Sequence, residues 1–167
     1  MNTESKAFLH KLLTAPSPTG FEQPVQRIVR EHMKRHADTI ETDLHGNVIV
    51  GINTKASRRV MLAGHCDQIG FMVKHISKEG FVYVGALGGI DAGVLHGAHV
   101  TIHGSSGAVD GVFGRKPIHM QTGEERDRMK LDLEKMWIDI GASSQKEAEK
   151  KIQNGDPVTF KLGVTEL

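Results

Sequence analysis

The feature that most constrains the fold is a change in the pattern of residue types at Gly70. Beyond this residue, short runs of β-branched and aromatic residues alternate with glycines. The clearest runs are FMVKHI, GFVYVGAL, HVTIHG, AVDGVFG and DPVTFKL. Because β-branched and aromatic residues fit a pleated surface and glycine permits tight turns, the pattern predicts a small β-barrel or sandwich.

The preceding residues show helical periodicity instead. Apolar positions between Ala7 and Leu13 lie near helical spacing, and the stretch PSPTG that follows ends the helix. From Phe21 to His36 apolar residues recur at steps of three and four, with Pro24 early, where its missing N–H does no harm. Two helices are therefore expected before the first strand.

Strands are expected between these helices and Gly70. The sequence TIETDLHGNVIVGIN places His-Gly-Asn between two strand-like runs and predicts a hairpin, and RRVMLAGHCD predicts the next strand. Helices followed by strands are typical of an α/β layer. Later in the chain, EERDRMKLDLEKM predicts a solvated helix or loop, and SSQKEAEKKIQNG predicts a helix capped by Ser143 or Ser144 and ended by Gly155.

Charge and cysteine content narrow the class of protein. Lys and Arg number 21 against 20 Asp and Glu, so the net charge of +1 provides no footprint for nucleic acid or an anionic membrane. Cys66 is the single cysteine, which excludes an intramolecular disulfide and fits a reducing compartment. The N-terminus lacks the pattern of a secretory signal, and no apolar run is long enough to span a bilayer. We expect a cytoplasmic protein.

One short motif bears recognisable chemistry. In VMLAGHCDQIG, strand alternation places His65 and Asp67 on one face and Cys66 on the other. An imidazole is a good ligand for zinc or cobalt, and a neighbouring carboxylate commonly orients it by accepting its other N–H. A His-x-Asp pair is more often a hydrogen-bonded strand end, so the motif by itself leaves both interpretations open.

For the other candidate residues, the sequence favours structural roles over catalytic or metal-binding ones. The ten histidines are scattered without a metal-binding spacing, and His75, His96, His99 and His103 are expected at the surface or in ordinary hydrogen bonds. His119 is expected to have a structural placement, with a role near a dimer interface or the rim of an active site as the alternative. Cys66 has no visible activating neighbour and is expected to be a small buried residue.

A series of blocks in fixed order identifies a family resemblance. The blocks are APSPTGFE, DLHGNVIV, VMLAGHCDQIGFMV, GGIDAGVLHGAHVTI, GVFGRKPIHM, EERDRMKLDLEKMWIDIGASS and NGDPVTF. From about Leu12 to Phe160 the chain resembles the metal-dependent aminopeptidases of metallopeptidase family forty-two, the tetrahedral, glutamyl and deblocking aminopeptidases. The resemblance implies a two-metal exopeptidase with zinc or cobalt, in which His65 binds one metal and Asp67 orients it.

The resemblance also implies a domain organisation. Residues 1–69 would form part of an α/β catalytic domain, residues 70–163 an inserted β-barrel used for dimerisation, and residues 164–167 the return to the catalytic domain. In the family, five further active-site residues follow the inserted domain: a bridging aspartate, a glutamate base, its carboxylate neighbour, another acidic ligand and a second histidine. They have no counterpart here, because Asp139 and Asp156 match blocks of the insert.

Two functional hypotheses follow. In the first, the chain is a family aminopeptidase that acts on peptide N-termini when its metal site is completed, with at most one weak metal site of its own. In the second, it is a non-catalytic dimerisation or assembly module derived from that family. Both predict a homodimer or larger homo-oligomer, and both predict that this chain alone lacks peptidase activity, because neither the general base nor the bridging carboxylate is present.

Overall fold

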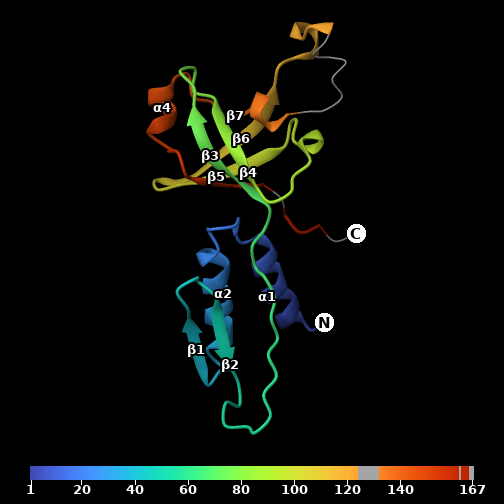
Figure 1. Ribbon diagram of the computed structural model, residues 1–167, viewed down its shortest axis with the longest axis vertical. Coiled ribbons are helices and arrows are strands. Elements are labelled where there is room, and N and C mark those ends of the chain that lie inside the picture. Colours follow the sequence, from blue (N-terminus) through green and yellow to red (C-terminus); the bar gives the residue numbers. More distant parts are fainter. Residues whose placement is uncertain (124–131, 162, 166–167) are drawn as a thin grey trace. The chain divides into compact units, whose positions relative to one another are not determined.

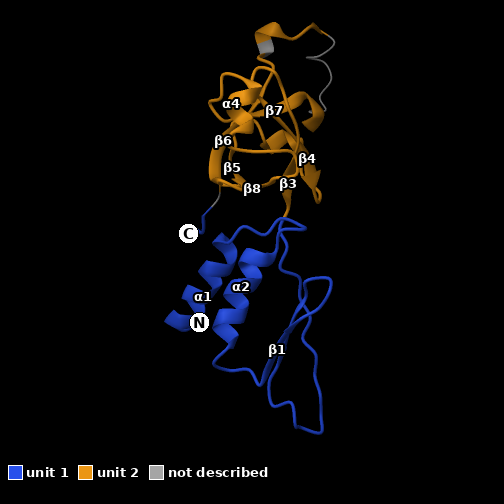
Figure 2. Cartoon of the chain, turned by 90° about the vertical axis from the view of Figure 1, so that its left-hand side faces the viewer, with its two compact units in different colours: residues 1–68, 163–167 blue, residues 69–162 orange. Residues whose placement is uncertain are grey.

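The computed structural model describes residues 1–123, 132–161 and 163–165. The chain divides into two compact units, residues 1–68 with 163–167 and residues 69–162 (Figure 2). Each unit has its own secondary structure and is described separately. The first is a helix pair with a hairpin, and the second is a barrel.

Two helices and one hairpin make up the first unit (Figure 1). Its elements are α1 (Thr3–Thr14), α2 (Gln23–Met33), β1 (Thr39–Thr42) and β2 (Val48–Gly51). The side chain of Asn2 caps α1 by accepting the N–H of Ser5, and Pro24 lies in the first turn of α2. Both predicted helices are confirmed. Phe8 of α1 stacks on His32 of α2 with ring centroids 3.7 Å apart, so the helices contact through an aromatic pair.

The predicted hairpin is also confirmed. β1 and β2 pair antiparallel from Thr39 opposite Gly51 to Thr42 opposite Val48. In the turn, Gly46 has a φ of +88°, which glycine adopts without steric cost. One oxygen of Asp43 accepts the N–H groups of His45 and Asn47, each at 2.9 Å, and thereby fixes the turn.

The strand expected at residues 58–67 does not form. These residues are extended and carry no ladder pairing to any described residue, while Val60, Met61 and Leu62 are at least 85% exposed. The apolar run has the composition of a buried strand, but a strand needs neighbours that satisfy its backbone groups. Within the described part of the first unit, the sheet consists of β1 and β2 only.

The second unit is a closed barrel of six antiparallel strands in the order β3-β4-β7-β6-β5-β8. Its strands are β3 (Gly70–Ile76), β4 (Val82–Leu87), β5 (His99–Gly104), β6 (Gly107–Arg115), β7 (Met136–Asp139) and β8 (Pro157–Phe160). The shorter helices are η1 (Ala92–Val94), η2 (Ile118–Met120), η3 (Leu133–Lys135) and α4 (Gln145–Glu149). The predicted α/β fold with a β-barrel is confirmed.

Alternating side chains fill the barrel core. In β3, Phe71 and Val73 point inward and are at most 2% exposed, whereas Met72 lies outside. The ring of Phe71 contacts those of Phe113 and Phe160, with centroids 5.0 and 5.3 Å apart. This alternation is the burial pattern of a sheet with one face in the core.

Three segments of the barrel unit depart from what the sequence predicted or lie largely outside the described residues. β7 was missed, because its four residues follow a strongly charged stretch; its first residue, Met136, is 1% exposed. Most of the charged stretch 124–136, predicted as a solvated helix or loop, lies outside the described residues. The helix predicted within residues 143–155 is confirmed but spans only Gln145–Glu149, with Ser144 at its N-cap and Gly155 at a φ of +93° beyond it.

Candidate functional site

His65 and Asp67 lie together at the end of the extended segment. Nδ1 of His65 is 2.9 Å from Oδ1 of Asp67, although neither residue belongs to a strand. The His65 side chain is 85% exposed and the Asp67 side chain 35% exposed. The sequence therefore predicted the contact correctly, while the strand assumed for it is absent.

A third residue joins this pair. Oγ1 of Thr19 donates to Oδ2 of Asp67 at 2.8 Å, so the two carboxylate oxygens have different partners. Sequence reasoning missed Thr19, which lies 48 positions before Asp67. Its place in the block APSPTGFE was the only available signal, and that block gave no indication of which side chain it would contact.

Hydrogen bonding determines the charge and the tautomer of the pair. The hydrogen bond from Thr19 and then that from His65 hold the pKa of Asp67 below its usual value of 3.8. Asp67 is therefore an ionised carboxylate at neutral pH and can only accept, so a neutral His65 carries its proton on Nδ1. Nε2 of His65 then presents an unprotonated lone pair, which is the form that binds a metal ion.

The other sequence candidates lie elsewhere. His75, His96, His99 and His119 are exposed, and Nε2 of His103 lies 2.9 Å from Oγ1 of Thr159. Cys66 is half-buried rather than buried, because residues 60–65 beside it do not pack in a sheet; its Sγ accepts from Nε2 of Gln26 at 3.9 Å. Among the described residues, no three His, Cys, Asp or Glu side chains come together as a metal-binding group.

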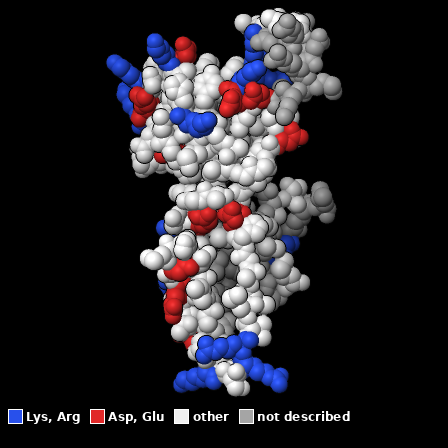
Figure 3. Space-filling model, viewed as in Figure 1, with Lys and Arg blue, Asp and Glu red and all other residues white. Residues whose placement is uncertain are grey.

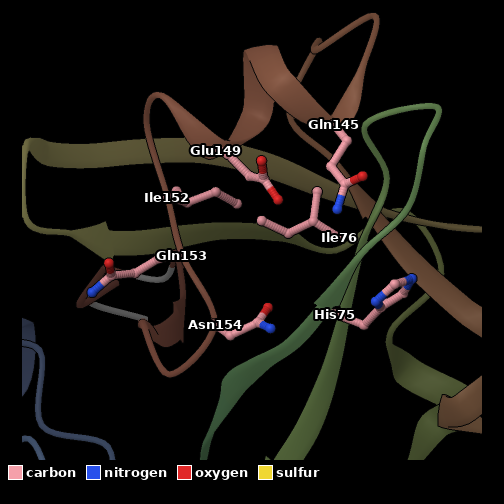
Figure 4. Close-up of a pocket in the computed structure, with 7 residues that line it drawn as sticks. All are labelled: His75, Ile76, Gln145, Glu149, Ile152, Gln153 and Asn154. Atoms are coloured by element: carbon pink, nitrogen blue, oxygen red, sulfur yellow. The ribbon is translucent and has the colours of Figure 1, made fainter.

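A pocket of about 410 Å³ lies on the barrel unit beside α4. The residues that line it, labelled in Figure 4, are His75 and Ile76 of β3, Gln145 and Glu149 of α4, and Ile152, Gln153 and Asn154, which follow α4. Its polar groups are one imidazole, one carboxylate and amides. This combination lacks both a metal-binding cluster and an activated nucleophile.

The visible surface of the barrel unit shows no single-sign charge field. Acidic and basic side chains are interspersed over the face drawn in Figure 3. This mixture agrees with a net charge of +1. In the described part of the chain, every helix is too short or too polar to cross a bilayer.

Comparison with known proteins identifies the family. The family model described as M42 glutamyl aminopeptidase matches residues 46–167, which is more than half of the chain. The chain belongs to this family. The resemblance seen in the sequence blocks is therefore confirmed, and the M42 homologues are aminopeptidases, a class of peptide hydrolase.

Individual M42 relatives agree with this assignment. The lysyl aminopeptidase of Pyrococcus furiosus is 33% identical over 142 residues, which are 84% of this chain and 41% of that protein. A TET aminopeptidase from a marine sediment archaeon of the Thaumarchaeota has a TM-score of 0.93 at 34% identity, covering 98% of this chain and 46% of its own.

A third relative carries information on assembly. The Pyrococcus horikoshii TET1 peptidase, described as able to assemble into a tetrahedron or a large octahedral shell, has a TM-score of 0.79 at 32% identity. The match covers 93% of this chain and 46% of that one. In all three comparisons, the chain spans less than half the length of its M42 relative.

Proposed function

We propose that this chain contributes one metal ligand and its orienting carboxylate to a metal-dependent aminopeptidase. The observation that carries the proposal is the pairing of His65 Nδ1 with the ionised Asp67, which leaves Nε2 of His65 free to bind a metal. In this assignment His65 is the ligand and Asp67 the orienting residue. Membership of the M42 family supports a peptide substrate attacked at its first peptide bond.

The donor chemistry fits a borderline cation. Imidazole nitrogen with a carboxylate behind it is a usual combination for zinc or cobalt. Two divalent ions, when bound in such a site, supply Lewis-acid activation of a water molecule. His65 would hold one ion while Asp67 keeps the imidazole in the required tautomer and orientation.

One imidazole does not complete a two-metal centre. The described residues contain no group of three metal-binding side chains, so further ligands would have to come from outside this part of the chain. We therefore expect the 167-residue chain alone to show no metal-dependent hydrolysis. Family membership would then indicate the reaction of the completed enzyme, which is peptide hydrolysis, while this polypeptide alone would be inactive.

We propose different roles for the two units. We assign residues 1–69 and 164–167 to the catalytic domain and residues 70–163 to an inserted dimerisation domain. Support comes from the closed barrel between residues 69 and 162 and from the assembly of the P. horikoshii relative into shells. We further propose a homo-oligomer, by analogy with that relative, and a cytoplasmic location, which the single cysteine fits.

A non-catalytic assembly module is the second candidate. It is favoured by the absence of a complete ligand group in the described residues and by the separate, closed barrel. In that case the His65–Asp67 pair would only stabilise local structure. Metal binding distinguishes the two functions.

The test is a cobalt titration of the purified chain, followed by NMR of the histidine ring signals. We expect the signals of His65 to broaden at the lowest cobalt concentration, because its side chain is exposed and Asp67 holds Nδ1, which leaves Nε2 for the metal. His65→Ala should remove this high-affinity broadening. His96→Ala is the matched control, because His96 is also exposed but lies on the barrel unit and has no carboxylate partner among the described residues.

An activity assay completes the test. Hydrolysis of a chromogenic leucine amide should be absent with cobalt or zinc and unchanged by chelator. Equal cobalt affinity in wild type, His65→Ala and His96→Ala would reject the metal-ligand role. Chelator-sensitive turnover that His65→Ala abolishes would keep that role and overturn the expectation of inactivity.

A further inference from the structure

The turn after α1 is fixed against the segment that carries Asp67. The N–H of Gln68 donates to the carbonyl of Ser17 at 2.7 Å, and Pro18 forms an isolated parallel bridge with Gln68. Ser17 and Pro18 are both buried. These backbone contacts hold residues 17 and 18 beside residue 68, although 51 and 50 positions separate them from it in the sequence.

The turn geometry places the next side chain. The N–H of Phe21 donates to the carbonyl of Pro18 at 2.8 Å, which closes a turn over Thr19 and Gly20. Gly20, third in the turn, has a φ of +89°, the value that a type II turn requires at that position. Thr19 thus occupies a defined backbone position with its hydroxyl on Oδ2 of Asp67.

We propose that Thr19 is a positioning residue for the metal-ligating histidine. Its hydroxyl holds Oδ2 of Asp67, so Oδ1 of the same carboxylate stays directed at Nδ1 of His65. Rotating the carboxylate away from His65 then costs the Thr19 hydrogen bond as well. The inference rests on the proposed role of His65, and it extends the chain of contacts from His65 through Asp67 to the α1–α2 turn.

Partial exposure makes this second restraint necessary. The Asp67 side chain is 35% exposed, so water competes for its oxygens. A carboxylate held by one donor could turn toward solvent, and a neutral imidazole without its acceptor can place its proton on either ring nitrogen. A proton on Nε2 would block the atom that binds metal.

The tautomer of His65 provides a test that is independent of catalysis. Ring nitrogen chemical shifts of the complete ¹⁵N-labelled chain, at about pH 8 where an ordinary histidine is neutral, report which nitrogen carries the proton. We expect wild type and Thr19→Ser to populate the Nδ1–H form. Thr19→Val keeps the side-chain shape but lacks the hydroxyl, and should shift the population toward Nε2–H.

Ser17→Ala is the matched control within the same turn. The Ser17 hydroxyl is buried and has no hydrogen-bond partner among the described residues, so its loss should leave the His65 tautomer unchanged. Asp67→Ala should abolish the preference entirely. A tautomer shift in Ser17→Ala as large as that in Thr19→Val would mean that general damage to the turn is responsible, and would overturn the proposal.

Cobalt affinity gives the second measurement. Loss of an outer partner of a ligand costs affinity, so Thr19→Val should weaken cobalt binding at His65 by about tenfold, and Thr19→Ser should restore it. Unchanged tautomer and affinity in Thr19→Val would overturn the positioning role while leaving His65 a ligand. A shifted tautomer with cobalt binding insensitive to His65→Ala would support positioning by Thr19 and reject the metal-ligand role.

Discussion

At the scale of single residues, hydrogen bonds between residues far apart in the sequence set the surroundings of titratable side chains. Asp67 is an example, because its two oxygens are held by one partner two positions away and another 48 positions away. His103 is a second example, since its imidazole in β5 lies beside Thr159 of β8, 56 positions later. In both cases a titratable side chain has an environment that local sequence does not reveal.

His103 leads to a pH-dependent stability. Burial lowers the pKa of His103 below its ordinary value of 6.5. His103 therefore has a lower pKa in the folded chain than in the unfolded chain. Between these two pKa values the unfolded chain binds more protons, so the free energy of unfolding falls as the pH decreases through this window. We expect urea unfolding of the barrel to show lower stability at about pH 5.5 than at about pH 7.5.

The contribution of His103 can be isolated by substitution. His103→Gln should flatten the pH dependence, whereas His96→Gln, at an exposed position, should preserve it. Identical pH profiles for wild type and His103→Gln would contradict the assignment. The comparison between the two variants removes the contributions of the other histidines.

At the scale of elements, the barrel packs through a glycine that has no room for a side chain. Gly111 of β6 pairs with Val100 of β5 and is buried. A Cβ added there would lie 2.4 Å from Cγ2 of Ile138 in β7 and 3.1 Å from the carbonyl oxygen of Asp139. The close approach of β7 to β6 thus depends on residue 111 being glycine.

Gly111→Ala should destabilise the barrel. Relieving the overlap with Ile138 requires strand or side-chain shifts, and overpacking of this kind costs about 1–3 kcal/mol. Chemical denaturation measures the change in the free energy of unfolding. Gly89→Ala is the matched control, because its Cβ would meet no atom within 4 Å; equal effects of the two variants would be inconsistent with this packing.

Sequence patterns predicted those elements whose cause is local. Helical spacing predicted α1 and α2, the His45-Gly46-Asn47 turn predicted the hairpin, and glycine-separated apolar runs predicted five of the six barrel strands. β7 was missed because four residues after a charged stretch give little periodicity. The extended segment 58–67 was wrongly assigned as a strand, because strand formation depends on neighbours that its own sequence does not encode.

At the scale of the whole chain, the two units differ in how fully their backbone is paired. The barrel strands close on one another, whereas residues 58–67 of the first unit have no ladder partners among the described residues, and residues 58–65 of this segment are exposed. Apolar residues 60–62 are therefore held in water. Such a segment is open both to proteases and to association with another polypeptide.

Limited proteolysis should detect this difference. We expect trypsin to cut first after Arg58 or Arg59, because both are exposed and lie in the unpaired segment. Peptide mass analysis of early time points identifies the site. The variant with Arg58→Gln and Arg59→Gln should survive longer, and first cleavage within residues 80–160 would show that the barrel is the less protected unit.

The chain enters and leaves the barrel at neighbouring positions. β3 begins at Gly70 and β8 ends at Phe160, and these strands pair antiparallel with Phe71 opposite Val158. The chain therefore enters and leaves the barrel at adjacent points, like the two ends of a loop. In evolutionary terms, such a domain is transferable: a surface turn of a host protein could acquire or lose it in one genetic event, without separating the residues on either side of the insertion point.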